Sequence, residues 1–150
     1  MKTYPFSALF SRMKYITRWC LMRSTRPESL SEHTADTAML AHTLCLIGRH
    51  CTGTGAALRP EVVATAAIYH DAPEILTGDM PTPVKYHDPA ILDAYKAVEA
   101  GAEQRLLDTL PDDIRPAYEP VFAPADGDED DNDDVDDGVL LVLRRFGRAL

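Results

Sequence analysis

Apolar side chains recur at three- and four-residue steps along three stretches of the chain, a spacing typical of α-helices that bury one face. These stretches are residues 31–49, 60–71 and 89–110. Ser29 or Ser31 can cap the first helix. Pro60 suits the first turn of the second helix, and Pro111 ends the third. No comparable stretch alternates apolar and polar residues as a strand does, so the sequence predicts an all-α fold.

The segment between the second and third predicted helices, residues 76–85, reads Leu-Thr-Gly-Asp-Met-Pro-Thr-Pro-Val-Lys. One glycine and two prolines prevent a continuous helix there, so we expect an ordered loop. The last residue, Lys85, either helps to order this loop or adds positive potential to it.

The acidic residues are concentrated near the end of the chain. Nine of the 24 Asp and Glu residues lie between positions 126 and 137, which leaves 15 acids to balance the 15 Lys and Arg residues. Because dense like charge opposes compaction, we expect a disordered acidic segment over 124–138. A folded domain over 1–123, closed by a Pro-rich connection, precedes it, and a short terminal helix over 139–150 follows. The nearly neutral remainder lacks the basic face that a nucleic acid polymer requires.

The cysteines and the apolar runs bear on the location of the protein. None of the three cysteines forms a C-x-x-C pair, and unpaired thiols favour a reducing cytoplasm. No run of about 18 apolar residues is present, and the basic N-terminus is not followed by the apolar stretch of an export signal. We therefore expect a cytoplasmic protein with no membrane partner.

The adjacent pair His70-Asp71, at the end of the second predicted helix, can offer an imidazole nitrogen and a carboxylate oxygen to one divalent ion. A third ligand must come from elsewhere, and His33, at the start of the preceding helix, is the natural one. Glu74 follows four residues after His70, where its carboxyl suits a general acid or base beside a metal-bound water. Alone, the dipeptide is a weak signal, because a buried histidine is more often hydrogen-bonded than bound to a metal.

Five segments extend this pattern: Arg18-Trp19, Leu21-Met22-Arg23, Ser31-Glu32-His33, Tyr69-His70-Asp71-Ala72-Pro73-Glu74 and residues 76–85. Over roughly residues 6–120 the chain resembles the HD-domain metal-dependent phosphohydrolases, and within them the 5'-deoxynucleotidase family. The resemblance implies an all-α HD-domain helical bundle. It also implies a homodimer.

The resemblance implies three ligands for a divalent metal ion such as Mn, Co or Mg: His33, His70 and Asp71. The family pattern also expects a fourth ligand, an Asp near the start of a C-terminal helix. Asp137 is the closest positional match, although Asp134 and Asp136 fit almost as well.

The resemblance further implies that Glu74 activates the attacking water and that Arg18 holds the phosphate, as a guanidinium does through paired hydrogen bonds. Trp19 and Asp79 would shape the deoxyribose pocket. The indole is bulky enough to exclude a ribose 2'-hydroxyl, and the carboxylate can accept a hydrogen bond from the 3'-hydroxyl. For Trp19 the alternative is ordinary core packing.

The reaction expected from this resemblance is the hydrolysis of deoxyribonucleoside 5'-monophosphates to deoxynucleoside and phosphate. One alternative is a deoxynucleoside triphosphate hydrolase of the same superfamily, which would use the same metal ligands. Another is a catalytically inactive nucleotide-binding module, an interpretation that follows from the unusual C-terminal segment.

Overall fold

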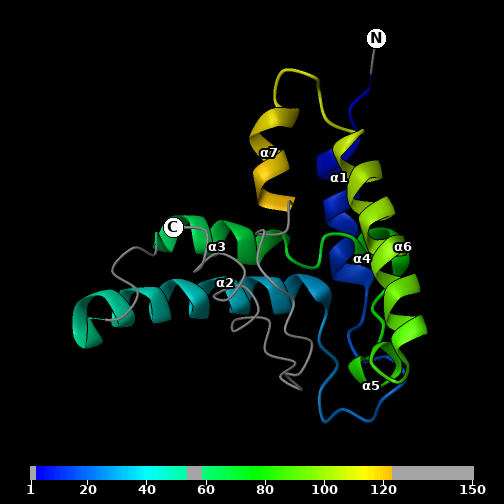
Figure 1. Cartoon of the computed structure of the whole chain (residues 1–150), viewed down its shortest axis with the longest axis horizontal. Coiled ribbons are helices and arrows are strands. Elements are labelled where there is room, and N and C mark those ends of the chain that lie inside the picture. The colour runs from blue at the N-terminus through cyan, green and yellow to red at the C-terminus, as the bar shows by residue number, and fades with distance from the viewer. Residues whose placement is uncertain (1–2, 54–58, 123–150) are drawn as a thin grey trace. The chain divides into compact units, whose positions relative to one another are not determined.

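The computed structural model describes residues 3–53 and 59–122 of the chain. By their contacts, the residues form two compact units, Met1–His33 with Asp71–Pro120 and Thr34–His70 with Val121–Leu150. The described residues contain helices and turns but no strand, which confirms the all-α prediction (Figure 1). The predicted acidic segment and terminal helix, 124–138 and 139–150, lie outside the described residues.

The helices in chain order are α1 Phe6–Phe10, the 3-10 helix η1 Ser11–Tyr15, α2 Leu30–Ile47, the π-helix η2 Gly48–Thr52, α3 Pro60–Tyr69, α4 Glu74–Thr77, α5 Thr82–Lys85, α6 Pro89–Leu107 and α7 Arg115–Phe122. The three helices predicted from apolar spacing are α2, α3 and α6. The expected loop over 76–85 is instead mostly two short helical turns, the end of α4 and α5. The expected Pro-rich connection contains α7.

The first unit is organised around α6, against which α4 and α5 both pack (Figure 1). Asp88 caps α6 by accepting a hydrogen bond of 2.7 Å from the Ala90 N–H, and Pro89 occupies the first turn. The helix ends at Leu107, earlier than expected, because the Leu110 N–H bonds three residues back to the Leu107 carbonyl and so tightens the chain before Pro111.

The second unit contains the helices α2 and α3, which lie side by side and run in opposite directions (Figure 1). Their buried residues form one cluster: Ala38, Ala41 and Cys45 from α2 with Val63, Ala66 and Ala67 from α3. Because four of the six are alanines, the two helix backbones can approach closely. The end of α3 is covered by Phe122, whose ring centroid lies 5.9 Å from that of Tyr69.

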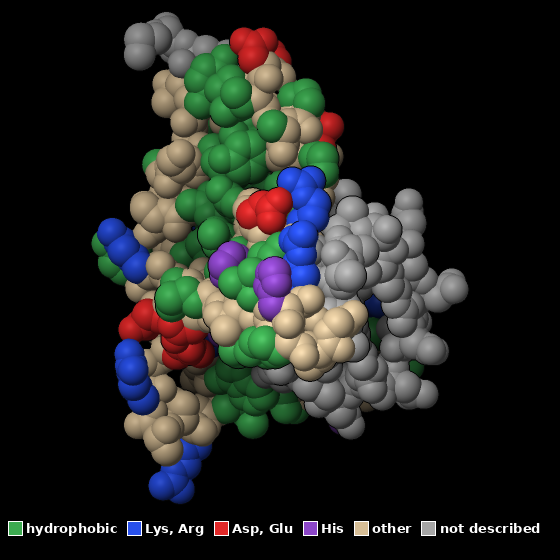
Figure 2. Space-filling view, turned by 90° about the vertical axis from the view of Figure 1, so that its left-hand side faces the viewer, with side chains coloured by type: hydrophobic (Ala, Val, Ile, Leu, Met, Phe, Trp, Pro, Cys, Tyr) green, Lys and Arg blue, Asp and Glu red, His purple; other side chains and the backbone are tan. Residues whose placement is uncertain are grey.

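Charged and histidine side chains form small groups among hydrophobic ones on the face of the molecule that Figure 2 shows. Several large apolar side chains are exposed, including Met39 and Leu40 of α2 and Ile68 of α3. Within the described ranges, however, no helix has both the length and the apolar composition needed to cross a membrane.

Candidate active site

The first turn of α2 positions His33 through a capping box. Ser29 Oγ accepts a hydrogen bond from the Glu32 N–H at 3.2 Å, while the Glu32 carboxylate accepts one from the Ser29 N–H at 2.8 Å. This backbone hydrogen bond is the main cause of the lowered pKa of Glu32. The His33 N–H donates to the Ser29 carbonyl at 3.0 Å, so Ser29 is the cap and Ser31 is not. The reciprocal bonds fix the start of the helix and with it the His33 backbone.

Asp71 lies in the turn between α3 and α4, close to His33. Its Oδ2 atom lies 3.6 Å from Nε2 of His33, and the two side chains are only 17% and 16% exposed. The turn is closed by the Glu74 N–H, which donates to the Asp71 carbonyl at 3.1 Å. An imidazole nitrogen and a carboxylate oxygen thus face each other in a partly buried place, as two ligands of one ion would.

His70, the residue before Asp71, has the tautomer that a metal ligand needs. Its Nδ1 lies 2.7 Å from the Ala67 carbonyl, which can only accept, so Nδ1 carries a proton and, in the neutral ring, Nε2 offers its lone pair. A backbone carbonyl that orients a ligating histidine in this way is common at metal sites. The contact is local, because the Ala67 carbonyl lies only three residues before His70, at the end of α3.

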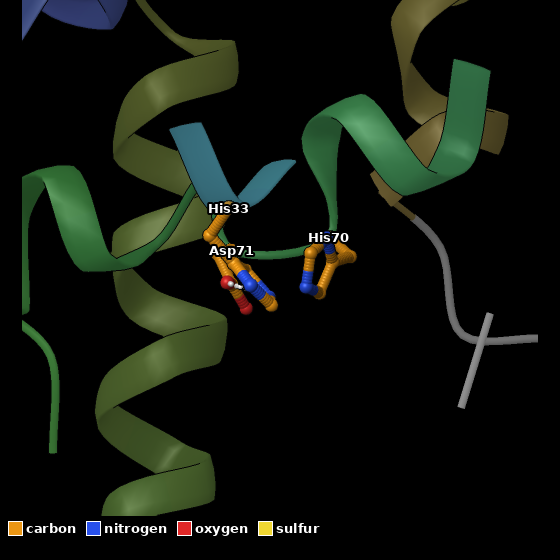
Figure 3. A group of neighbouring side chains, drawn as sticks. All are labelled: His33, His70 and Asp71. Carbon is orange, nitrogen blue, oxygen red and sulfur yellow. Dashed lines mark ion pairs between the residues drawn. The ribbon is translucent and has the colours of Figure 1, made fainter. Parts of the chain in front are cut away.

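His33, His70 and Asp71 together fit a metal ion. Each offers one ligand atom, and these atoms all lie within 4.8 Å of one another. Figure 3 shows the His33 and Asp71 side chains extending in the same direction, with the His70 ring beside them. Two imidazole nitrogens and a carboxylate oxygen are a donor set that first-row divalent ions accept, although it does not select among them.

The charge around Glu74 also favours a cation. Burial, followed by the negative charges of Asp71 and Asp79, raises the pKa of Glu74 to about 9, and Arg18 and Lys85 offset this only in part. The Glu74 Oε2 atom is buried and has no hydrogen-bond partner among the described residues. A divalent ion beside Asp71 would compensate this excess of carboxylates.

Arg18 supplies positive charge to the same region. Its backbone N–H donates to the Glu28 carbonyl at 2.9 Å, next to the isolated antiparallel bridge between Thr17 and Ser29. Its guanidinium is 12% exposed and lies 3.8 Å from a Glu28 carboxylate oxygen. That carboxylate also lies 3.9 Å from Nδ1 of His33, so Glu28 connects the arginine to the histidine. Glu28 was not predicted, because no sequence motif marks it and only the Thr17–Ser29 bridge brings it close to Arg18.

Trp19 and Asp79, expected to shape a sugar pocket, are linked directly. The Trp19 N–H donates to Oδ2 of Asp79 at 2.5 Å. Trp19 has a φ of 53°, in the left-handed region that non-glycine residues rarely adopt. Trp19 is intermediate in exposure. The fourth expected ligand, Asp137, lies outside the described residues.

Comparisons with known proteins identify the family and the fold. The sequence model of the family described as 5'-deoxynucleotidase YfbR-like matches residues 5–138. This match is longer than the resemblance seen in the sequence, residues 6–120, and it includes the acidic segment 124–138. A 5'-deoxynucleotidase of Vibrio parahaemolyticus is 46% identical over 132 residues, 88% of this chain and 67% of the relative. The 5'-deoxynucleotidase YfbR of Salmonella paratyphi B is 48% identical over 122 residues, 81% of this chain and 60% of the relative.

A solved structure supports the fold. An HD-domain phosphohydrolase from Listeria innocua matches with a TM-score of 0.70 at 20% sequence identity, covering 91% of this chain and 61% of that one. The chain thus spans about two thirds or less of the length of the proteins it matches. The expected HD-domain fold is confirmed, and the chain belongs to the 5'-deoxynucleotidase YfbR-like family.

Proposed function

We propose that the chain hydrolyses deoxyribonucleoside 5'-monophosphates to deoxynucleoside and inorganic phosphate, with water as the nucleophile and a divalent metal ion as cofactor. The observation that carries this proposal is the convergence of His33, His70 and Asp71, with ligand atoms within 4.8 Å of one another. Membership of a 5'-deoxynucleotidase family supports the monophosphate over the triphosphate as substrate.

His33, His70 and Asp71 would hold the ion, and Asp137 would be its fourth ligand. When bound, such an ion lowers the pKa of a coordinated water and polarises phosphoryl oxygens. Glu74 follows Asp71 by one turn and is held in a buried place. With the ion bound, its positive charge would offset the carboxylates that raise the Glu74 pKa, so the ionised carboxylate would accept the proton of the attacking water and return it to the departing 5'-oxygen of the nucleoside.

Arg18 would anchor the phosphate. Its partly buried guanidinium offers paired N–H donors that match phosphate oxygens, and its charge opposes the negative charge that grows during phosphoryl transfer. Glu28 would keep this guanidinium oriented before the substrate enters. Trp19 and Asp79 would border the sugar, since their mutual hydrogen bond holds them together near Glu74, which Asp79 influences electrostatically.

Phosphate release from a panel of nucleotides tests the proposal. We expect orthophosphate from deoxyribonucleoside monophosphates with Mn, Co or Mg, much less from ribonucleoside monophosphates, and none after EDTA treatment. Release of triphosphate from a deoxynucleoside triphosphate would instead support the triphosphohydrolase. Nucleotide binding without turnover under all metals would support an inactive binding module. The homodimer and the cytoplasmic location stay predictions, which gel filtration and cell fractionation can check.

A further inference from the structure

Lys85, the last residue of α5, makes an ion pair with the middle of α6. Its Nζ lies 3.0 Å from Oε1 and 3.2 Å from Oε2 of Glu99, and each of the two side chains is only 23% exposed. The pair joins α5, which ends at Lys85, to α6. Because solvent reaches it poorly, this pair is less screened than an exposed one.

The same ammonium group lies over the ring of Tyr95, one turn before Glu99 on α6. The distance from Nζ to the ring centroid is 4.9 Å, within the range of a cation–π interaction. Tyr95 is buried, with 7% of its surface exposed. Lys85 and the surrounding helix therefore leave the ring little freedom to move.

The hydroxyl group of Tyr95 reaches the loop that carries Asp79. It donates to the Gly78 carbonyl at 3.4 Å, and the Thr77 hydroxyl donates to the same carbonyl at 3.0 Å. Burial raises the pKa of Tyr95 to about 12, so the phenol stays a donor at physiological pH. Gly78 has a φ of 78°, which a side chain would disfavour, and the residue that follows is Asp79.

Asp79 in turn holds Trp19 in its left-handed conformation, through the hydrogen bond from the Trp19 N–H. A backbone conformation of this kind persists only where neighbouring groups fix it. The contacts therefore run without a break from Lys85 and Glu99 to Tyr95, to the Gly78 peptide, to Asp79 and finally to Trp19.

We propose that Tyr95 and the Lys85–Glu99 pair are positioning residues for sugar recognition, which hold the Gly78–Asp79 turn so that Asp79 and Trp19 keep their places. They do so without touching the substrate. The inference rests on the proposed function only in naming deoxyribose as the sugar; the coupling to Trp19 is independent of any substrate.

Three variants test this network: Tyr95→Phe, which keeps the ring and removes the hydroxyl, Lys85→Met, which removes the charge, and Lys85→Arg, which restores it. Arg115→Met is the matched control, since Arg115 makes ion pairs with Asp108 and Glu119 on the same unit, away from this network. Circular dichroism and thermal melting verify that each variant is folded.

Trp19 is the only tryptophan of the chain, so intrinsic tryptophan fluorescence reports on it alone. We expect Tyr95→Phe and Lys85→Met to shift the emission to longer wavelength and to increase quenching by acrylamide. Arg115→Met should leave both unchanged, and Lys85→Arg should return them toward the wild-type values. Unchanged emission and quenching in both Tyr95→Phe and Lys85→Met would overturn the inference, whether or not the protein has activity.

Steady-state kinetics test the consequence for specificity. For Tyr95→Phe we expect the ratio of kcat/KM for deoxyadenosine monophosphate to that for adenosine monophosphate to fall about three- to tenfold, the size expected for one hydrogen bond. The fall should come mainly from KM. An unchanged ratio in an active enzyme would overturn the role in sugar recognition. A wild-type protein that releases no phosphate would refute the proposed function, while the fluorescence result would still decide the coupling.

Discussion

The Nε2 atom of His33 lies 3.6 Å from the Oδ2 atom of Asp71, although the two residues come from the start of α2 and from the turn before α4. At this distance both atoms can bind one ion, or His33, when protonated, can pair with the carboxylate. The two states compete, because a metal ion and a proton require the same imidazole lone pair. Ion binding at this pair should therefore depend on both side chains and weaken in acid.

Substitution of either residue should remove the ion. We expect Asp71→Asn and His33→Gln to weaken Mn binding by about 100-fold or more, beyond the 10- to 100-fold effect usual for groups that only orient ligands. Isothermal titration calorimetry measures the affinity directly. His87→Ala, at an exposed histidine outside the ligand group, is the matched control and should bind as the wild type does. Equal affinities in all four proteins would contradict the ligand assignment.

Replacement of Arg18 should show whether phosphate binding needs only a positive charge or also the paired donors of a guanidinium. Arg18→Lys keeps the positive charge but loses the planar pair of donors, so we expect KM for a deoxynucleoside monophosphate to rise about tenfold or more. Arg18→Met should be worse still. Lys14→Met, at an exposed cation on η1, provides the comparison. If Arg18→Lys had a wild-type KM, the arginine would not hold the phosphate through paired bonds.

The stability of the metal-free protein should fall as the pH rises, because of Glu74. Its pKa is about 9 in the folded chain against an ordinary value of 4.5, so between these values the folded state keeps a proton that the unfolded state has released. Rising pH then favours the unfolded state. In EDTA, Glu74→Gln should therefore gain stability over the wild type at pH 8, and this gain should shrink toward pH 5. Urea unfolding at the two pH values measures it, and a gain independent of pH would contradict the raised pKa.

The three thiols should react at two rates. Cys20 and Cys51 are exposed, whereas Cys45 is buried between α2 and α3, where burial raises its thiol pKa. Since the thiolate is the reactive form, Ellman's reagent should label two thiols rapidly and the third only on unfolding. Cys45→Ala should abolish the slow phase alone. Three equally fast thiols in the folded protein would show that the packing of α2 on α3 is wrong.

Apolar spacing predicted the helices whose own sequence carries the signal. In α2, α3 and α6 the buried residues recur with the helical period, and Pro60 and Asp88 mark two of the starts. The signal fails for α7 because Pro120, inside that helix, reads locally as a break. In α4 and α5 it fails because four residues are too few to show a period.

The residues of the site likewise fall into those that a sequence motif marks and those that only the fold brings together. His33, His70, Asp71 and Glu74 were predicted because they belong to short motifs, and the structure places the first three within reach of one ion. Glu28, Tyr95 and Glu99 were missed, because their contacts with Arg18, Gly78 and Lys85 arise only when distant segments approach. Such partners have no pattern in the sequence that distinguishes them from any surface carboxylate or core tyrosine.

The most direct test of the account is phosphate release from deoxyadenosine monophosphate by the wild type and by Asp71→Asn, both with saturating Mn. We predict turnover by the wild type that EDTA abolishes and added Mn restores. In Asp71→Asn we predict a loss of about 100-fold or more, with the fold intact by circular dichroism. Equal phosphate release by the two proteins, or release by the wild type that persists in EDTA, would contradict a metal-dependent reaction at this site.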